Sequence, residues 1–103
     1  MVRHCVFIRF RADVSDAEIN GLLDAIVDLR CHLAGILDVH VAPNSSPEVG
    51  MDRGYAHGFI VDFETAADRD RYLADDRHRA VGAELVRAAA GGTDGIFVYD
   101  LEI

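Results

Sequence analysis

The order of its periodic segments constrains the fold of this 103-residue chain more than any other feature. Residues 2–11 and 55–63 alternate between apolar and polar side chains, which predicts two strands, and residues 36–41 and 95–103 are predicted as two more. Residues 16–33 and 65–89 instead repeat their apolar side chains every three or four positions, as helices do. The predicted order is βαββαβ in a single domain, residues 1–103, without a linker or an internal repeat.

Capping residues mark the ends of both predicted helical regions. Ser15 and Glu18 form a capping box before the first apolar stripe, and Thr65 is placed to cap the second region. Gly35 is predicted as the C′ residue that ends the first helix, and the glycine pair at 91–92 ends the second. Local sequence therefore supports the helices independently of their apolar spacing.

Two strand–helix–strand halves of this length favour a four-stranded antiparallel sheet with both helical regions on one face, the ferredoxin-like α+β arrangement. The other face also carries apolar side chains, contributed by Cys5, Phe7, Ile60 and either Ile96 or Phe97. A sheet that is apolar on both faces needs a second cover. Because the chain has no residues left to provide one, we predict a homodimer in which two sheets face each other.

The charge and the composition exclude several partners. A net charge of −8 argues against binding nucleic acid, whose phosphates need a basic surface. No apolar run approaches the ~20 residues that cross a bilayer, and the N-terminus lacks the apolar core of a signal peptide. We therefore expect a cytoplasmic protein without a membrane partner. Cys5 and Cys31 are accordingly predicted to be reduced thiols.

Missing residue types narrow the chemistry further. The chain has no lysine, which excludes a Schiff base, and none of its three serines lies in a G-x-S-x-G elbow. The glycine-rich phosphate-binding loops and the C-x-x-C pair are also absent. We expect no cofactor, and the reactive side chains that remain are histidine, tyrosine and carboxylates.

Tyr72 and His78 are the main candidates for catalysis. In one continuous helix, a six-residue offset would turn their side chains about 240° apart. A bend at Asp75-Asp76-Arg77 would instead let both enter one pocket as proton donor and acceptor. Imidazole is a competent general base at neutral pH, and a phenol stabilises an enolate by hydrogen bonding. This pairing suits proton abstraction beside a carbonyl, followed by intramolecular aldol closure.

Three further polar residues, His4, His57 and Asp100, are predicted to face the helices. Each histidine alone is more simply a hydrogen-bonded core residue, and Tyr72 a packed helix aromatic. Their convergence with His78 nevertheless favours a polar pocket, in which Asp100 orients an imidazole. A metal site is a weaker alternative, since these side chains occur in none of the usual ligand spacings.

Two other segments carry no specific prediction of a site. The charged residues between 68 and 79, Arg69 among them, are most simply a solvated helix face. The polar loop 44–54 is either a lid over the pocket or a connector.

The chain resembles the stress-responsive A/B barrel domain family in the order of these features. A strand with His4, a polar loop, a strand with Tyr55 and His57, and a helix with Tyr72 before His78 follow one another as in that family. The likeness extends from residue 2 to residue 101 and includes the last strand. It implies a dimeric α+β barrel.

Within that family, plant polyketide cyclases use a tyrosine and a histidine that match Tyr72 and His78. Residues that line their pocket match His4, His57 and Asp100, so the resemblance implies catalysis by the first pair and substrate binding by these three. The chain departs from the pattern at three places: Asp75-Asp76-Arg77-His78 replaces His-Pro-x-His, Val41-Ala42 replaces Trp-Gly, and Ile26 replaces a pocket tyrosine. The resemblance therefore implies the acid–base pair and not a particular substrate.

Two functions from different classes remain. The first is cofactor-free acid–base catalysis on a carbonyl or polyketide-like small molecule, of the cyclase or lyase kind. The second is a non-catalytic dimeric module that binds a small hydrophobic ligand or takes part in a stress response. A cavity beside His78 favours the first function, and a pocket filled by Ile26, Phe59 and Leu85 favours the second.

Overall fold

The computed structural model describes residues 1–103, and its elements follow the predicted order. The four strands are β1 (Val2–Ile8), β2 (Ile36–Pro43), β3 (His57–Phe63) and β4 (Ile96–Glu102). The three α-helices are α1 (Asp16–Asp28), α2 (Ala66–Ala74) and α3 (Asp76–Ala88), and short 3₁₀ turns span Leu29–Cys31 and Gly92–Gly95. None of these helices has the length and apolar composition needed to cross a membrane.

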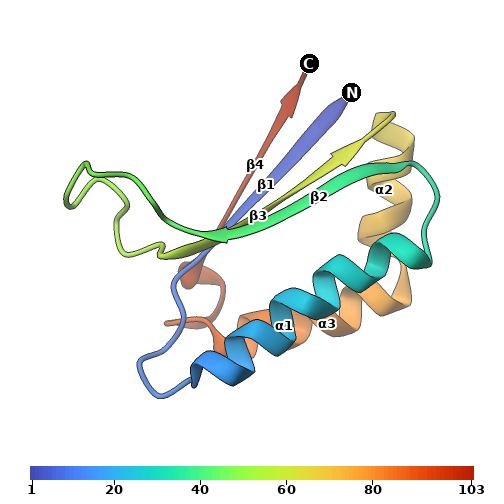
Figure 1. The fold of residues 1–103 in the computed structure, drawn as a ribbon. Coiled ribbons are helices and arrows are strands. Elements are labelled where there is room, and N and C mark those ends of the chain that lie inside the picture. Colours follow the sequence, from blue (N-terminus) through green and yellow to red (C-terminus); the bar gives the residue numbers. More distant parts are fainter.

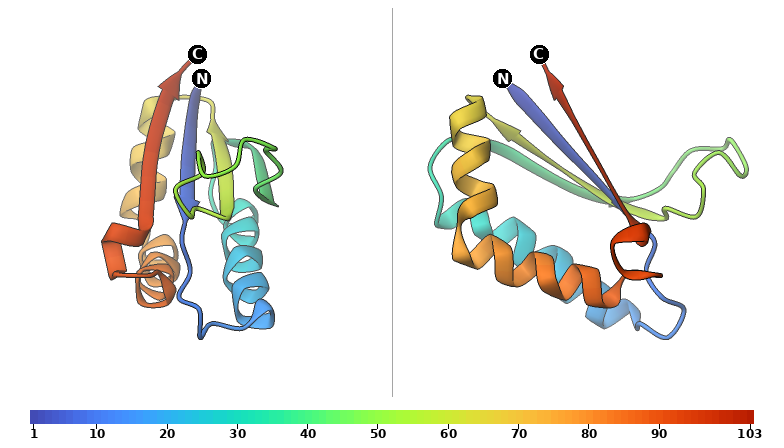
Figure 2. Two further views of the ribbon diagram at one scale, coloured as in Figure 1. Left: turned by 90° about the vertical axis from the view of Figure 1, so that its left-hand side faces the viewer. Right: turned by 180° about the vertical axis from the view of Figure 1, so that it is seen from behind.

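The strands form one antiparallel sheet in the order β2-β3-β1-β4. All three helices lie on one side of this sheet, with α1 beside α3 and α2 at one end (Figures 1 and 2). We call this side of the sheet the inner face and the uncovered side the outer face. The predicted ferredoxin-like α+β arrangement is confirmed.

The core lies between the inner face and the helices. Its largest fully buried side chains come from both layers, and they are Ile8, Ile26, Val61, Phe63 and Tyr72. Burying an aliphatic or aromatic side chain of this size contributes about 1.5–3 kcal/mol. The core therefore fixes how α1, α2 and α3 sit on the sheet.

Both predicted N-caps form. The Ser15 hydroxyl accepts the backbone N–H of Glu18 at 3.1 Å, and the Thr65 hydroxyl accepts that of Asp68 at 3.1 Å. Each bond satisfies an N–H group that the first turn of a helix cannot pair internally. The starts of α1 and α2 are thus set by local sequence.

β1 is shorter than predicted, whereas the other strands agree with their predicted bounds within two residues. It ends at Ile8 because the next residues pair elsewhere. The N–H of Arg9 donates to the carbonyl of Gly95 at 2.8 Å, and Phe10 forms an isolated bridge with Ala89. These bonds tie the end of β1 to the segment that follows α3.

The predicted role of Gly35 as a helix C′ residue is wrong. α1 ends at Asp28, and a 3₁₀ turn separates it from Gly35. Gly35 has φ +84°, and a Cβ atom at this position would overlap the carboxylate of Asp68 in α2. Glycine is therefore needed for both the left-handed backbone and the close approach of α2.

The outer face is apolar and exposed. Four large side chains on β1 and β4, Phe7, Phe97, Tyr99 and Leu101, are between 37% and 55% exposed. Of the two alternatives that the sequence left for β4, Phe97 lies on the outer face, whereas Ile96 packs against the core. The predicted second apolar face is therefore present on the sheet.

Candidate functional site

A bend between α2 and α3 brings Tyr72 and His78 together. Asp75 alone separates the two helices, and its extended backbone (φ −68°, ψ 137°) turns the chain. Its carboxylate caps α3 by accepting the backbone N–H groups of Arg77 at 2.8 Å and His78 at 3.4 Å. The ring centroids of Tyr72 and His78 lie 4.3 Å apart, with 48° between the ring planes. Two side chains that a continuous helix would separate are thus in contact.

Tyr72 is enclosed by other rings. Its ring centroid lies 5.0 Å from that of Phe63 and 6.0 Å from that of His4, both in edge-to-face geometry. This packing buries all but 1% of the residue. The Tyr72 hydroxyl and His78 Nδ1 are both buried, and neither has a hydrogen-bond partner. Such groups are costly in a folded protein, so the pair holds two polar atoms whose capacity for hydrogen bonds is unused.

Burial also sets the protonation of the pair. It raises the pKa of Tyr72 above its ordinary value of 10.0. It lowers the pKa of His78 below 6.5, and the charge that His4 carries when protonated lowers it further. At neutral pH the phenol is therefore protonated and the imidazole of His78 is neutral. A hydrogen-bond donor lies beside a base.

His4 and Asp100 form a second polar pair next to the first. They are direct partners in the register of β1 and β4, and both side chains lie on the inner face. His4 Nδ1 lies 2.7 Å from Asp100 Oδ1, and the other carboxylate oxygen accepts a hydrogen bond from Arg69 of α2 at 2.9 Å. His4 is only 4% exposed. The structure therefore brings four of the five predicted site residues, His4, Tyr72, His78 and Asp100, into one cluster.

A cavity of about 270 Å³ reaches this cluster between the inner face and α3. His4, His78 and Asp100 supply its polar lining. Ile26, Phe59 and Leu85 also line it, and they do not fill it. Its volume is on the order of nine water molecules' share of the liquid, which suits a small molecule. Tyr72 does not line the cavity itself but packs behind His4 and His78, which do.

The structure does not bring His57 to this cavity. His57 pairs with Ile8, whereas His4 pairs with Val61, so the two histidines are four positions apart along the sheet. At 3.3 Å per residue, this separation is about 13 Å. The ring of His57 instead packs edge-to-face on Phe10, with 5.4 Å between the ring centroids. Alternation placed His57 on the correct face but not at the correct position along the strand.

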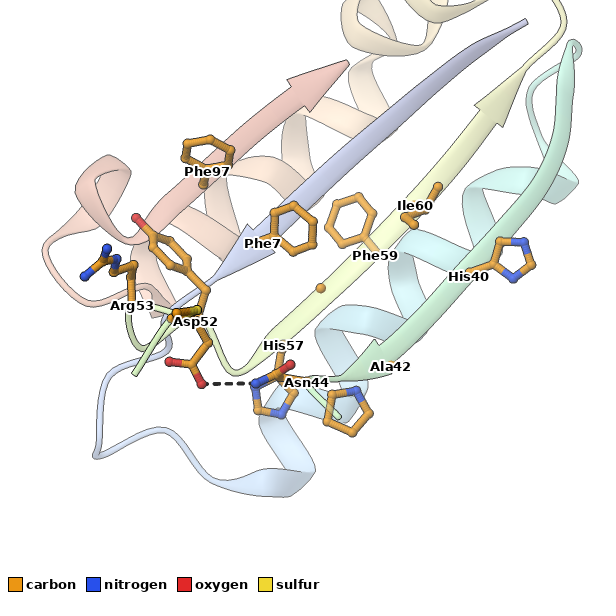
Figure 3. A pocket seen from close by; sticks show the side chains of 14 residues that line it. Phe7, His40, Ala42, Asn44, Asp52, Arg53, His57, Phe59, Ile60 and Phe97 are labelled. Atoms are coloured by element: carbon orange, nitrogen blue, oxygen red, sulfur yellow. Dashed lines mark hydrogen bonds between the residues drawn. The ribbon is translucent and has the colours of Figure 1, made fainter. Parts of the chain in front are cut away.

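His57 lines a larger cavity of about 520 Å³ at the end of the sheet (Figure 3). The loop after β2 forms one wall of it, where the Asn44 side-chain amide donates to the Asp52 carboxylate at 3.1 Å. Phe7 and Phe97 of the outer face form another wall. This cavity opens on the outer face and holds neither Tyr72 nor His78. The loop 44–54 is therefore part of this second cavity and does not line the first.

Arg69 is a site residue that sequence reasoning missed. It belongs to a run of alternating charges, which indicated a solvated helix face. Arg69 lies three positions before Tyr72 in α2, and residues three apart share a side of a helix. That spacing was the available signal. No group of three histidine, cysteine, aspartate or glutamate side chains in the structure is arranged to hold a metal ion.

The comparisons with known proteins agree with this fold. A family model described as the Stress responsive A/B Barrel Domain matches residues 2–103. A dimeric ferredoxin-like protein of unknown function from Jannaschia sp. CCS1 is 27% identical, with a TM-score of 0.84, over 99% of this chain and 98% of that one. No curated protein matches the sequence.

Two plant structures are also similar. An Arabidopsis thaliana protein is 22% identical, with a TM-score of 0.88, over 100% of this chain and 95% of that one. The hydroxynitrile lyase from Passiflora edulis is 20% identical, with a TM-score of 0.86, over 99% of this chain and 92% of that one. At these identities the likeness shows the fold alone.

Proposed function

This chain belongs to the stress-responsive A/B barrel domain family, and from that premise we propose that it is a cofactor-free acid–base catalyst. Its substrate is a small, largely apolar molecule with a carbonyl group, and the reaction is of the cyclase or lyase kind. His78 is the general base and Tyr72 the hydrogen-bond donor. His4 and Asp100 help to bind the substrate. His57 has no part in this proposal because it lies outside the cavity.

One observation carries the proposal: a buried phenol and a half-buried imidazole, each with a buried polar atom that has no partner, lie in contact, and the imidazole lines a cavity. The large majority of buried side-chain polar atoms in folded proteins are paired, so two unpaired atoms in contact are unusual. Paired titratable groups whose pKa values are moved apart by burial are typical of catalytic sites. Here the pKa of Tyr72 is raised and that of His78 is lowered.

The chemistry follows from these two protonation states. The unprotonated ring nitrogen of His78 takes the proton from the carbon beside the carbonyl. The electrons of that C–H bond form a C=C bond, and the carbonyl π electrons move to the oxygen, where the Tyr72 hydroxyl donates a hydrogen bond. The enolate carbon then attacks a second carbonyl of the same molecule, or it takes the proton back from the imidazolium.

Substrate must also reach the Tyr72 hydroxyl. Because His4 and His78 line the cavity and Tyr72 lies behind them, and because His4 is held by Asp100, the proposal requires the His78 ring to turn within the cavity so that the carbonyl oxygen reaches the Tyr72 hydroxyl. A change in the ultraviolet absorption of tyrosine on ligand binding would report this movement.

Proton exchange at carbon tests the base without knowledge of the natural substrate. Benzylacetone, a methyl ketone of suitable size, is incubated with the protein in heavy water, and deuterium beside the carbonyl is followed by proton NMR. We expect exchange above the buffer rate, a loss of about 10²–10⁴-fold in His78→Asn and of about 10²–10³-fold in Tyr72→Phe. Mandelonitrile cleavage is a parallel assay for lyase chemistry: a base takes the hydroxyl proton, the C–CN bond breaks, and benzaldehyde and hydrogen cyanide are released.

Matched controls separate the site from the surface. His32→Asn alters an exposed histidine outside the cavity, and Tyr99→Phe alters a tyrosine of the outer face, on the other side of the sheet from the cavity. Both variants retain the wild-type rate if the proposal is correct. Equal rates in wild type, His78→Asn and Tyr72→Phe, with all three proteins folded, would show that the pair is not catalytic.

A non-catalytic binding module is the second candidate function. It is favoured by the mainly apolar lining of the cavity and by the position of Tyr72 behind the lining residues. In this case benzylacetone binds wild type and Tyr72→Phe with equal affinity by calorimetry, and no exchange above buffer occurs in either protein.

A homodimer completes the proposal. The outer face exposes Phe7, Phe97, Tyr99 and Leu101, an apolar surface that monomeric proteins rarely leave uncovered. The similar Jannaschia protein is described as dimeric. Two copies that pack outer face to outer face would cover these side chains and enclose the 520 Å³ cavity.

A further inference from the structure

The carboxylate of Asp100 is shared between two residues from different layers of the fold. Its Oδ1 atom lies 2.7 Å from His4 Nδ1, and its Oδ2 atom accepts from Arg69 Nη1 at 2.9 Å. Arg69 is itself held by a second carboxylate, because its Nε donates to Asp70 at 3.0 Å. The helix α2 therefore fixes the arginine, and the arginine fixes the carboxylate.

This contact decides which nitrogen of His4 carries a proton. A carboxylate only accepts hydrogen bonds, so the nitrogen that faces Asp100 must be protonated. A neutral His4 is then the Nδ1–H tautomer, and its Nε2 has a free lone pair. His4 is 4% exposed and lines the smaller cavity, so this lone pair can serve a ligand that binds there.

We propose that Arg69 is a positioning residue of the site: it holds Asp100 against His4 and so keeps His4 in the Nδ1–H tautomer, with Nε2 as a second hydrogen-bond acceptor at the cavity. The proposal rests on the proposed function for its catalytic consequence. Arg69 touches no reacting atom. It acts through Asp100 on His4, which packs against Tyr72 and lines the cavity together with His78.

The charges around His4 explain why an arginine is required. Asp100 of β4, Arg69 and Tyr72 of α2 and His78 of α3 are the charged or titratable groups around it in these contacts. Without Arg69, one oxygen of Asp100 has no partner and the carboxylate is free to turn toward solvent, since a quarter of its side chain is exposed. His4 then has no fixed acceptor for its Nδ1 proton and populates both tautomers.

Removal of Arg69 is expected to leave the fold intact. Both side chains of the Arg69–Asp100 pair are 25% exposed, and ion pairs near the surface contribute only about 0–1 kcal/mol. A structural role alone would therefore predict a small change in stability and nothing else. The positioning role predicts a specific change at His4, which lies on another element.

Nitrogen NMR of histidine-labelled protein tests this directly. In the wild type, His4 is expected to show a single Nδ1–H tautomer whose proton exchanges slowly with water. In Arg69→Met we expect a mixture of both tautomers and at least tenfold faster exchange of this proton, and Arg69→Lys restores the wild-type signature in part. Arg79→Met, which removes an exposed arginine of α3 that makes no side-chain ion pair, leaves the His4 signals unchanged.

The outcome separates this inference from the proposed function. Unchanged His4 signals in folded Arg69→Met would overturn the positioning role, whatever the protein catalyses. If Arg69→Met does not fold, Asp100→Asn is used in its place, and it should also convert the single His4 tautomer into a mixture. A single Nδ1–H tautomer in Asp100→Asn would refute the inference. Where deuterium exchange into benzylacetone is observed, Arg69→Met lowers kcat on the order of 10- to 100-fold with KM nearly unchanged.

Discussion

Replacing Tyr72 with phenylalanine should stabilise this protein while it removes the proposed catalytic donor. The substitution deletes one hydroxyl group and leaves the ring, which packs 5.0 Å from Phe63 and 4.3 Å from His78 between centroids. The deleted hydroxyl is buried and has no hydrogen-bond partner. Tyr72→Phe therefore removes an uncompensated polar group and no packing.

The magnitude follows from the cost of such a group. Burying an unsatisfied hydroxyl costs about 1–3 kcal/mol relative to leaving it in water. We expect the free energy of unfolding of Tyr72→Phe to exceed that of the wild type by about 1–2 kcal/mol. In a domain of about 100 residues, each kcal/mol corresponds to about 4–8 °C in Tm.

Alkaline pH enlarges the difference. Because burial raises the pKa of Tyr72 above 10.0, the folded protein keeps a proton that the unfolded chain releases above that pH. The stability linked to Tyr72 is present below pH 10 and is lost as the pH rises toward the folded-state pKa. The wild type then loses up to about 1.4 kcal/mol per pH unit that Tyr72→Phe does not lose.

The assay is urea unfolding at a fixed protomer concentration, because the stability of a dimer depends on concentration. Tyr55→Phe is the matched control: its exposed hydroxyl donates to the carbonyl of Asp94 at 3.3 Å, so its removal should be neutral or slightly destabilising. If Tyr72→Phe is no more stable than wild type and has the same slope above pH 10, the Tyr72 hydroxyl has a buried partner. The inference that this group is held ready for a ligand would then be refuted.

Three further outcomes are expected. Gly35→Ala should lower the free energy of unfolding by about 1–2 kcal/mol, because an L-residue is strained at φ +84° and its Cβ would meet Asp68. The control Gly21→Ala in α1, where an added Cβ meets nothing within 4 Å, should raise it by up to about 1 kcal/mol in the same urea experiment. Burial lowers the pKa of His78, so the unfolded chain takes up a proton at this residue before the folded protein does as the pH falls below 6.5. The free energy of unfolding of the wild type therefore declines there. Urea titrations of His78→Asn should show a shallower decline. Phe97→Asp should dissociate the dimer, as measured by light scattering. The control is Val49→Asp, because Val49 is 99% exposed in the loop 44–54 and its substitution should leave the dimer intact. A Phe97→Asp protein that dimerises with wild-type affinity would contradict the outer-face interface.

Local sequence accounts for much of the fold. Ser15 and Thr65 cap the helices as predicted, since a cap depends only on residues within one turn. Alternation assigned His4 to the inner face and Phe7 to the outer face, because strand geometry fixes the side on which each residue lies. The contact between Tyr72 and His78 could also be predicted from local sequence, because Asp75 both ends α2 and caps α3.

Position along the strands was not predictable in the same way. His57 has the face that alternation gave it, but the register of β1 with β3 places it four positions from His4. Arg69 lies in a charged run that resembles solvated surface, and only the packing of α2 beside β4 brings it to Asp100. Register and helix placement depend on the whole core, which no local pattern encodes.

The sequence by itself determined the order of elements, the two faces of the sheet and the residue types available for chemistry, because periodicity, capping and composition act over short distances. Only the tertiary structure decided that His78 borders an open cavity, that Tyr72 lies just behind its wall and that Asp100 is shared by His4 and Arg69. A cavity is what remains when Ile26, Phe59 and Leu85 have packed. Its existence is a property of how the layers fit together and of no single residue.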